Sequence, residues 1–368
     1  MTPPAVPAPQ PVAVAPAPEP AKPAPAPKLS MAEMQKEVLK KYMDAFNASD
    51  AKAIAGMYSQ DAMLVQSGMP EAKGKEAIES STKAFMDGFP KSKIAATRFF
   101  QKGDMAVCEW AWNGTHAGEF MGMAPTNKNV GYTGVGIFWF DQDGQIKKEH
   151  RYFDVATLMG QLGMSKEKVR AIPTLATTVD FVTAKGTPDE DKNAETLKNM
   201  MGAFEKKSET DFLASLTDGI EYDAQAEPAS HKGKAEAKKA FSMMTKAFPD
   251  QKISYDTMMG VGDFAIMEST MTGTHKGALG PIPATKKTVS LKGVDICQFK
   301  DAKIDHCWNY SNNMEFLTQL GLVKAPGAAK TDKTDKADKA AAKATTPAKA
   351  DKAEKAAAPA KAPTPAKK

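Results

Sequence analysis

The chain contains the same sequence unit twice, and this repeat constrains its fold more than any other feature. Segments of the first copy recur in the second copy in the same order, at an offset of 158 to 159 residues. The matched segments are YMDAF 42–46 with MGAF 201–204, AKGKEA 72–77 with HKGKAEA 231–237, NGTHAG 113–118 with TGTHKG 272–277, GVGIFWF 134–140 with GVDICQF 293–299, and QLG 161–163 with QLG 319–321. Because so many matches in a fixed order are hard to obtain by chance, we infer an internal duplication.

Composition sets the two ends of the chain apart from the repeated part. Residues 1–29 hold eleven of the 25 prolines, and residues 324–368 consist almost entirely of Lys, Ala, Asp, Thr and Pro. Segments with so few large apolar side chains cannot form a packed core, so we expect both ends to be disordered. The repeat then predicts one domain over 30–163 and a second over 191–323, joined by a linker at 164–190.

The net charge of +5 does not belong to the predicted domains. Residues 324–368 carry +7 and residues 1–29 carry +1, which leaves −3 for residues 30–323. A mildly acidic pair of domains is not expected to bind nucleic acid. Any weak, salt-sensitive polyanion contact would come through the tail, whose alternative role is a solubilising or tethering extension.

Membrane insertion and export leave no clear signal in the sequence. No run of eighteen apolar residues occurs, so we expect no integral membrane association. No export signal is visible, but a Pro/Ala spacer often follows a cleaved signal. The compartment, cytoplasmic or exported, therefore stays open.

The cysteines and histidines do not indicate a metal or redox site. Cys108, Cys297 and Cys307 are too few for a disulfide framework, and no C-x-x-C motif is present. The five histidines lack the spacing of a metal site. We therefore expect buried free thiols, no metal site and no cofactor.

Within the first unit, helical periodicity comes first and strand periodicity afterwards. Ser30 and Glu33 form a capping-box pattern ahead of apolar residues at helical spacing, and Pro90 ends the last early helical stretch. The β-rich runs that follow are 94–100, 105–115, 130–140 and 145–153. This grouping is typical of an α+β fold in which helices cover one face of a curved antiparallel sheet.

The helix-rich start of each unit, the GTHAGEF and GTHKGAL segments, GVDICQF and the terminal QLG resemble the SnoaL-like polyketide cyclases. These proteins belong to the nuclear transport factor 2-like superfamily, and the resemblance covers about 134 residues of the first unit and about 133 of the second. It implies two tandem cone-shaped units, each with helices packed on a strongly curved antiparallel sheet around a pocket. Cones of this superfamily commonly pair through their sheets, so it also implies an internal pseudo-dimer or a homodimer.

The function that this resemblance implies is binding of a small, mostly apolar organic molecule in each cone, with acid/base catalysis of the cyclase, isomerase or hydrolase type in the first. In the family an aspartate nine residues before the closing glycine acts as general acid/base, and counting back from Gly163 gives Asp154. The same count from Gly321 gives Asn312, whose amide cannot exchange a proton at neutral pH. The alternative is a non-catalytic ligand-binding or protein-interaction module.

A histidine recurs at matching places in the two Gly-Thr-His segments. His116 is the second catalytic candidate of the first unit, because an imidazole there could polarise a carbonyl, and His275 is its counterpart in the second unit. The competing interpretation is a strand-end histidine bound to neighbouring backbone or to a carboxylate such as Glu109 or Glu268.

The remaining candidates are polar or aromatic side chains that the pockets would contain. Tyr222 and Asp223 are expected to enter the second pocket where the first unit has Val65 and Gln66. Asp295 aligns with Gly136, and its alternative is an exposed or capped carboxylate. The expected ligand-binding residues are Gln66, Trp110, Tyr152, Tyr222, Asp223, His275, Asp295 and Asn312.

Overall fold

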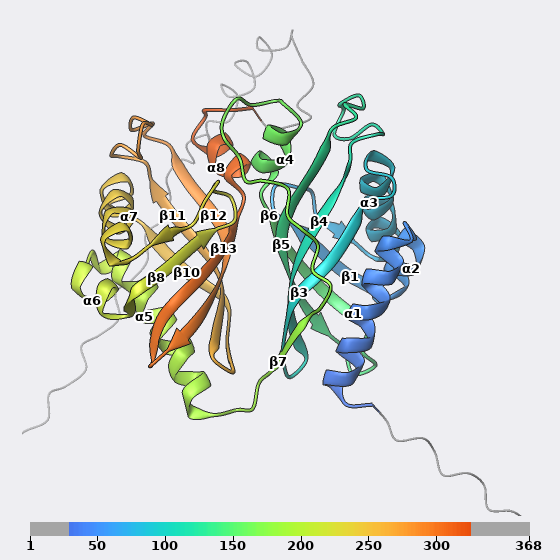
Figure 1. Cartoon of the computed structure of the whole chain (residues 1–368), viewed down its shortest axis with the longest axis horizontal. Helices are drawn as coiled ribbons and strands as arrows, with labels where there is room; N and C mark the ends of the chain where they lie inside the picture. The colour runs from blue at the N-terminus through green and yellow to red at the C-terminus, as the bar shows by residue number, and fades with distance from the viewer. Residues whose placement is uncertain (1–28, 325–368) are drawn as a thin grey trace, which may run out of the picture. The chain divides into compact units, whose positions relative to one another are not determined.

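The two sequence repeats fold into two α+β units of the same design, so the predicted fold class is confirmed (Figure 1). The structure is a computed structural model that describes residues 29–324. The Pro/Ala-rich start and the Lys/Ala-rich tail, which the composition predicts to be disordered, lie outside the described residues apart from Leu29 and Lys324. None of the helices within 29–324 is long and apolar enough to cross a membrane.

The first unit begins with helices and continues with a sheet. Its helices are α1 (Met31–Asn47), α2 (Ala51–Gly56), α3 (Lys75–Gly88) and α4 (Val155–Gln161). Its strands are β1 (Tyr58–Gln66), β2 (Ala72–Lys73), β3 (Lys93–Lys102), β4 (Met105–Thr115), β5 (Asn129–Phe140), β6 (Ile146–Phe153) and β7 (Asp180–Thr183), in the sheet order β2-β1-β6-β5-β4-β3-β7. The capping box of Ser30 and Glu33 starts α1 as predicted.

The second unit repeats this order of elements. Its helices are α5 (Pro188–Lys206), α6 (Glu209–Ala214), α7 (Lys234–Ala247) and α8 (Asn313–Gln319). Its strands are β8 (Leu216–Ala224), β9 (His231–Lys232), β10 (Lys252–Val261), β11 (Phe264–Thr274), β12 (Thr288–Lys300) and β13 (Lys303–Ser311), in the sheet order β10-β11-β12-β13-β8-β9.

Both sheets are mixed, whereas the sequence analysis predicts antiparallel sheets. β1 runs parallel to β6, and β8 runs parallel to β13. Each pair joins the first strand of a unit to its last long strand, and the intervening helix and antiparallel strands return the chain in the original direction. The alternation of side chains along a strand does not reveal the direction of its neighbour, so the sequence pattern could not show this.

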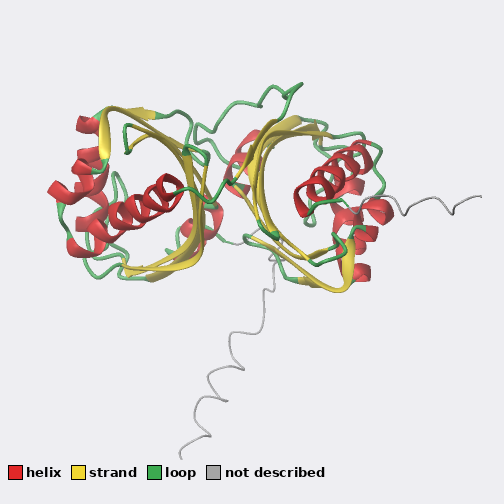
Figure 2. Ribbon diagram, turned by 90° about the horizontal axis from the view of Figure 1, so that it is seen from below, coloured by secondary structure: helices red, strands yellow, loops and turns green. Residues whose placement is uncertain are grey.

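Each sheet curves around helices of its own unit (Figure 2). Register shifts that mark β-bulges lie between Ala96 and Arg98 on β3 and between Tyr255 and Thr257 on β10. An extra residue on one strand bends that strand and increases its twist. The concave face of each sheet therefore encloses an apolar core of its own.

The convex faces of the two sheets pack against each other in a region that we call the sheet interface. Its apolar core includes Phe100, Val107, Val135, Ile137, Met259, Val261, Ile266, Val294 and Ile296. The Tyr152 hydroxyl donates a hydrogen bond to Glu268, and the Tyr310 hydroxyl donates one to Glu109. Tyr152 and Tyr310 are equivalent residues of the two repeats, and so are Glu109 and Glu268. The two hydrogen bonds are therefore equivalent contacts, one from each unit.

A disulfide joins Cys297 of β12 to Cys307 of β13, so the prediction of free thiols is wrong for these two residues. The two residues are direct partners in the β12–β13 register, with Cα atoms 4.1 Å apart. The sequence separation alone does not reveal this pairing, because it depends on the position of the turn and on the bulge in the hairpin. Cys108 is a free, buried thiol, as predicted, and burial raises its pKa well above the usual range.

The linker predicted at 164–190 contains more structure than its composition indicates. β7 pairs in parallel with β3, and α5 already begins at Pro188 behind a capping box formed by Thr187 and Glu190. The side chain of Glu190 is buried. Because β7 and the start of α5 lie within the predicted linker, the boundaries of the linker and of the two domains stay predictions.

Candidate functional site

A cavity of about 400 Å³ lies in the first unit between the concave face of the sheet and helices α1 and α3. Its size is in the range of small-molecule sites in proteins. Much of its wall is aromatic, and the contributing rings belong to Tyr42, Phe46, Phe85, Trp110, Trp112, Phe120, Tyr132, Phe138 and Phe153. The predicted ligand-binding residues Gln66 and Trp110 both line this cavity.

A buried ion pair supplies the polar part of the cavity wall. Glu149 and Arg151 alternate along β6 and so lie on the same, concave face of the sheet. The Arg151 Nε atom donates to Glu149 Oε1 at 2.8 Å and Nη2 donates to Oε2 at 2.9 Å. This two-point contact is the strongest geometry for an arginine and a carboxylate.

Three more side chains complete what we call the Glu149–Arg151 cluster. Arg151 Nη2 donates to the Tyr42 hydroxyl of α1 at 2.7 Å, and Nη1 donates to Gln66 Oε1 of β1 at 3.1 Å. The Tyr58 hydroxyl donates to Glu149. One N–H of Arg151 Nη1 has no hydrogen-bond partner among the described residues.

The cluster carries no net charge, and its tyrosines are protonated at neutral pH. Burial raises the pKa of Tyr42 to about 12, against the opposing effect of Arg151, and raises the pKa of Tyr58 well above its usual range. Burial lowers the pKa of Arg151, but the Glu149 carboxylate outweighs it, so the pKa is raised overall. The cluster therefore offers hydrogen-bond donors to an apolar cavity.

The Glu149–Arg151 cluster is not among the sites predicted from the sequence. Tyr42 belongs to the apolar stripe of α1, and only the strand order brings β1 beside β6. The available signal was the spacing of Glu149 and Arg151. In a strand, side chains two residues apart lie on the same face of the sheet, so Glu149 and Arg151 are expected to be neighbours. Here that face of the sheet is buried.

Asp154, the predicted general acid/base, does not line the cavity. It is the N-cap of α4, and its carboxylate accepts hydrogen bonds from the backbone of Ala156 and Thr157 and from the Thr157 hydroxyl. A further bond comes from the backbone N–H of Asn313 in the second unit, at 2.8 Å. Burial raises the pKa of Asp154, against these hydrogen bonds. The geometry favours helix capping over proton transfer to a ligand.

Asn312 makes the corresponding contact from the second unit. Its Oδ1 atom caps α8 by accepting from Met314 N, and it also accepts from Val155 N of the first unit at 3.2 Å. Its amide nitrogen donates to the Ser67 carbonyl oxygen. Asp154 and Asn312 are therefore reciprocal caps that tie the two units together.

We expect Asp154→Ala to lower the free energy of unfolding by about 1–2 kcal/mol, because the first turn of α4 loses its cap. Asp154→Asn should cost less, because asparagine is an equally good N-cap residue. Urea denaturation followed by circular dichroism would measure both changes. A variant Asp154→Asn that unfolds as easily as Asp154→Ala would contradict the capping role.

The two repeated histidines are bound to neighbouring backbone. In the first unit the Thr126 N–H donates to His116 Nδ1 at 3.2 Å, and the same contact joins Thr285 to His275 in the second unit. Neither histidine lines the cavity, and burial lowers the pKa of both. Each ring fixes the loop between two long strands, which is the alternative role considered from the sequence.

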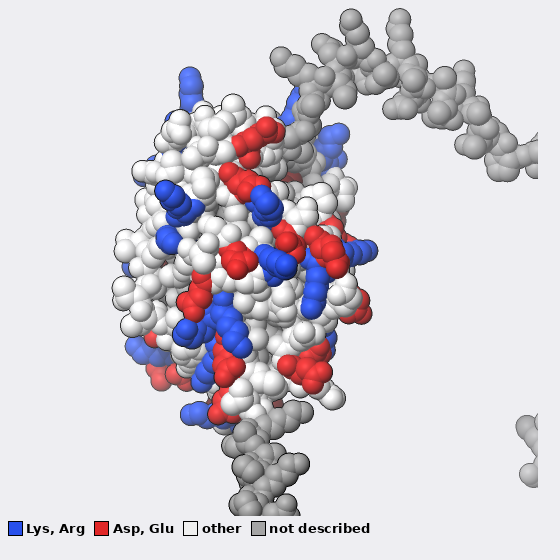
Figure 3. Space-filling view, turned by 90° about the vertical axis from the view of Figure 1, so that its right-hand side faces the viewer, with Lys and Arg blue, Asp and Glu red and all other residues white. Residues whose placement is uncertain are grey.

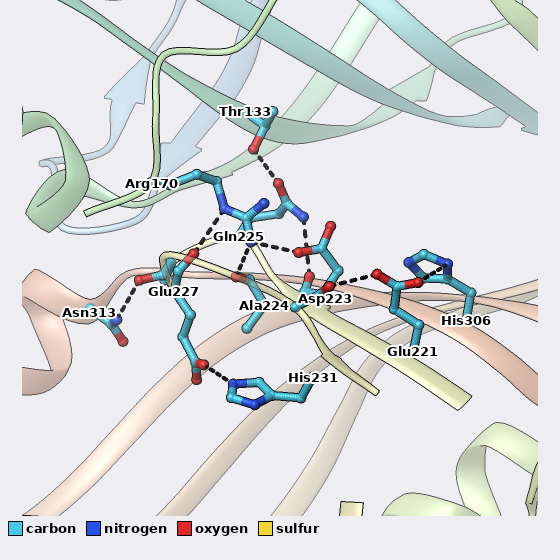
Figure 4. Close-up of polar contacts among 12 residues, drawn as sticks. Thr133, Arg170, Glu221, Asp223, Ala224, Gln225, Glu227, His231, His306 and Asn313 are labelled. Carbon is cyan, nitrogen blue, oxygen red and sulfur yellow. Dashed lines mark hydrogen bonds and ion pairs between the residues drawn. The ribbon is translucent and has the colours of Figure 1, made fainter. Parts of the chain in front are cut away.

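Two other candidates do not lie on the concave faces of their sheets. The Tyr152 hydroxyl bonds Glu268 in the sheet interface. Asp223 pairs with Arg170 of the predicted linker, with 2.6 Å between Oδ1 and Nη2, and Arg170 also bonds the carbonyl oxygens of Ala224 and Glu227 (Figure 4). Asp223 therefore anchors the chain segment between the units.

The strand registers correct the alignment of the second unit by one residue. Leu64 pairs with Glu149 in the first sheet, and Tyr222 pairs with Cys307 in the second. Tyr222 therefore corresponds to Leu64 and Asp223 to Val65. The residue of the second unit that corresponds to Gln66 is Ala224. In the same registers Cys307 takes the place of Glu149 and Asn309 that of Arg151, so the second unit lacks a matching ion pair.

Asp295 is buried on the concave face of the second sheet, where its Oδ1 atom accepts a hydrogen bond from Asn309 at 3.0 Å. Burial raises its pKa to about 6. No group of three or more His, Cys, Asp or Glu side chains suited to a metal ion occurs within residues 29–324.

Each of the solved structures similar to the chain matches about a third of its length. The putative hydroxylase AclR from Streptomyces galilaeus is 22% identical, with a TM-score of 0.34, and the match covers 36% of this chain and 98% of that one. A putative polyketide cyclase, IdmH from Streptomyces antibioticus, is 23% identical, with a TM-score of 0.32 and coverages of 35% and 98%. A putative SnoaL-like polyketide cyclase from Jannaschia sp. CCS1 is 15% identical, with a TM-score of 0.35 and coverages of 37% and 96%.

The family assignment rests on the sequence of both units. No curated protein matches the chain. The family model of the SnoaL-like polyketide cyclases matches it twice, over residues 36–162 and 195–320. These two regions together span more than half of its length, and the chain belongs to the SnoaL-like polyketide cyclase family.

Proposed function

We propose that the first unit binds a small, mostly apolar and uncharged organic molecule that carries an oxygen acceptor. The observation that carries this proposal is an aromatic cavity of about 400 Å³ with Arg151 in its wall. The rings would contact the apolar body of the ligand, while the unused N–H of Arg151 would donate to its oxygen. A charged ligand would find no counter-charge, because Glu149 already neutralises Arg151.

Catalysis of the cyclase, isomerase or hydrolase type would then depend on the Glu149–Arg151 cluster and not on Asp154. Donors aimed at a carbonyl oxygen stabilise the negative charge that develops there when a proton is removed or a nucleophile adds. Arg151 supplies such a donor beside the protonated Tyr42. A non-catalytic binding protein would use the same contacts to hold the ligand.

We further propose that the two units form an internal pseudo-dimer. The reciprocal bonds of the sheet interface and the reciprocal caps Asp154 and Asn312 support this arrangement. One face of the first unit carries basic and acidic side chains interspersed with each other, without a patch of a single sign (Figure 3). Weak polyanion contact through the tail remains a prediction that concerns residues outside the described part.

Binding in the cavity can be tested with prodan, an uncharged naphthalene ketone whose emission shifts to the blue in apolar surroundings. We expect Ser81→Trp to weaken prodan binding by at least about tenfold, because Ser81 lines the cavity and an indole would fill it. The matched control is Ala240→Trp, the same position of α7 in the second unit, which should leave the affinity unchanged. Equal affinities for all three proteins would reject the cavity as the site.

A further inference from the structure

The concave face of the second sheet carries much smaller side chains than that of the first. One row across β4, β5 and β6 consists of Trp110, Gly134 and Phe153. The corresponding row across β11, β12 and β13 consists of Ser269, Gly293 and Ser311. Two serines thus replace two large aromatic residues, which leaves space on this face.

The surroundings of the two central glycines differ in the same direction. A Cβ atom placed on Gly134 would lie 2.2 Å from the ring of Trp110, which covers it. At Gly293 the nearest heavy atom would be the Tyr310 backbone oxygen at 3.2 Å, and the nearest side-chain atom would lie 3.6 Å away, in Ser311. Gly134 is buried, whereas Gly293 is partly exposed.

The neighbouring row places a carboxylate in this space. Asp295 stands where the first unit has Gly136, and Asn309 where it has Arg151. Asn309 donates to Asp295 and accepts from the Ser311 hydroxyl at 3.1 Å, so these three residues form one polar chain. Asp295 is only 5% exposed, and no Lys, Arg or His within residues 29–324 forms an ion pair with it.

Tyr222 of β8 lies on the same concave face, because it pairs with Cys307, which is two residues from Asn309 on β13. Its side chain is 36% exposed. A carboxylate without a counter-charge and an exposed aromatic ring on the same face of a sheet are the combination that binds organic cations.

We propose that the concave face of the second unit is a separate binding site for an organic cation, whose ammonium group pairs with Asp295 and whose apolar part lies against Tyr222. This site is independent of the function proposed for the first unit. It differs in chemistry because the residues that make the first cavity aromatic and neutral are replaced here by serines and by an uncompensated carboxylate.

The test compares three probes of similar size on the full chain by titration calorimetry: tyramine, its uncharged analogue para-ethylphenol, and the anionic para-hydroxyphenylacetate. We expect tyramine to bind at least about tenfold more tightly than para-ethylphenol, since a hydrogen bond to a charged group accounts for that difference. Asp295→Asn should remove this preference. Asp256→Asn, which alters an exposed carboxylate on β10, should retain it.

A second variant tests the recess without altering the carboxylate. Ser269→Trp combined with Ser311→Phe restores the residues of the first unit and should abolish tyramine binding, while Ser81→Trp in the first unit should not change it. The proposal is wrong if tyramine and para-ethylphenol bind equally, if the anion binds most tightly, or if the filled variant binds tyramine like the wild type.

Discussion

Arg151→Met is expected to lower the free energy of unfolding by about 3–5 kcal/mol, the usual result of removing one partner of a buried ion pair. The variant leaves the Glu149 carboxylate buried without a counter-charge, and it also removes the donor to Tyr42. Urea denaturation followed by tryptophan fluorescence would report the change, because Trp110 and Trp112 line the same cavity.

The comparison variants separate this effect from a general loss of packing. Glu149→Gln added to Arg151→Met should recover part of the lost stability, since no buried charge then remains. Lys147 lies on the same strand as Arg151 and forms an exposed ion pair with Asp104. Lys147→Met should change the stability by less than about 1 kcal/mol. A loss of similar size in Lys147→Met, or none in Arg151→Met, would show that the ion pair is not the cause.

The sequence predicted the fold through features that depend on few residues at a time. The duplication is visible as matched segments such as NGTHAG and TGTHKG, and the α+β class follows from helical periodicity before strand periodicity. Strand direction and register involve pairs of distant residues. The parallel pairing of β1 with β6 and the Cys297–Cys307 disulfide therefore became visible only in the structure.

The candidate site was predicted less well, for a related reason. Counting from Gly163 located Asp154 in the chain but did not reveal what surrounds it. One donor to its carboxylate comes from Asn313, in the other unit. Arg151 was missed because its partners lie on α1, β1 and β6, which no local pattern connects. Gln66 and Trp110 could be predicted because their residue type and their position along a strand are enough to place them in the cavity wall.

Glu268→Ala is expected to lower the free energy of unfolding by about 3 kcal/mol or more, because it leaves several buried donors of the sheet interface without an acceptor. His150 Nδ1 and the Tyr152 hydroxyl donate to Glu268 across the interface, and the Thr257 hydroxyl donates from within the second unit. Each unpaired buried donor costs about 1–3 kcal/mol, offset in part where water enters. Urea denaturation of the full chain would measure the loss.

The pH dependence of stability gives this prediction a second readout. Burial raises the pKa of Glu268, but the hydrogen bond and charge of His150 and the hydrogen bonds of Tyr152 and Thr257 outweigh it, so the pKa is lowered from 4.5. A carboxylate whose pKa is lower in the folded state than in the unfolded state stabilises the folded protein. This contribution is complete above the unfolded pKa and is lost as the pH falls through the folded pKa. Glu268→Gln should therefore remove part of the acid sensitivity of the wild type below pH 4.5.

The surface variant Glu37→Gln is the matched control, since it also removes one carboxylate but lies on the exposed side of α1. It should retain the acid sensitivity of the wild type. If Glu268→Gln and the wild type lost stability in parallel as the pH fell, Glu268 would not be the titrating group of the interface. If Glu268→Ala were as stable as the wild type, the reciprocal tyrosine–glutamate bonds would not hold the two units together. The apolar core around Val107 and Ile296 would then be sufficient by itself to hold the two units together.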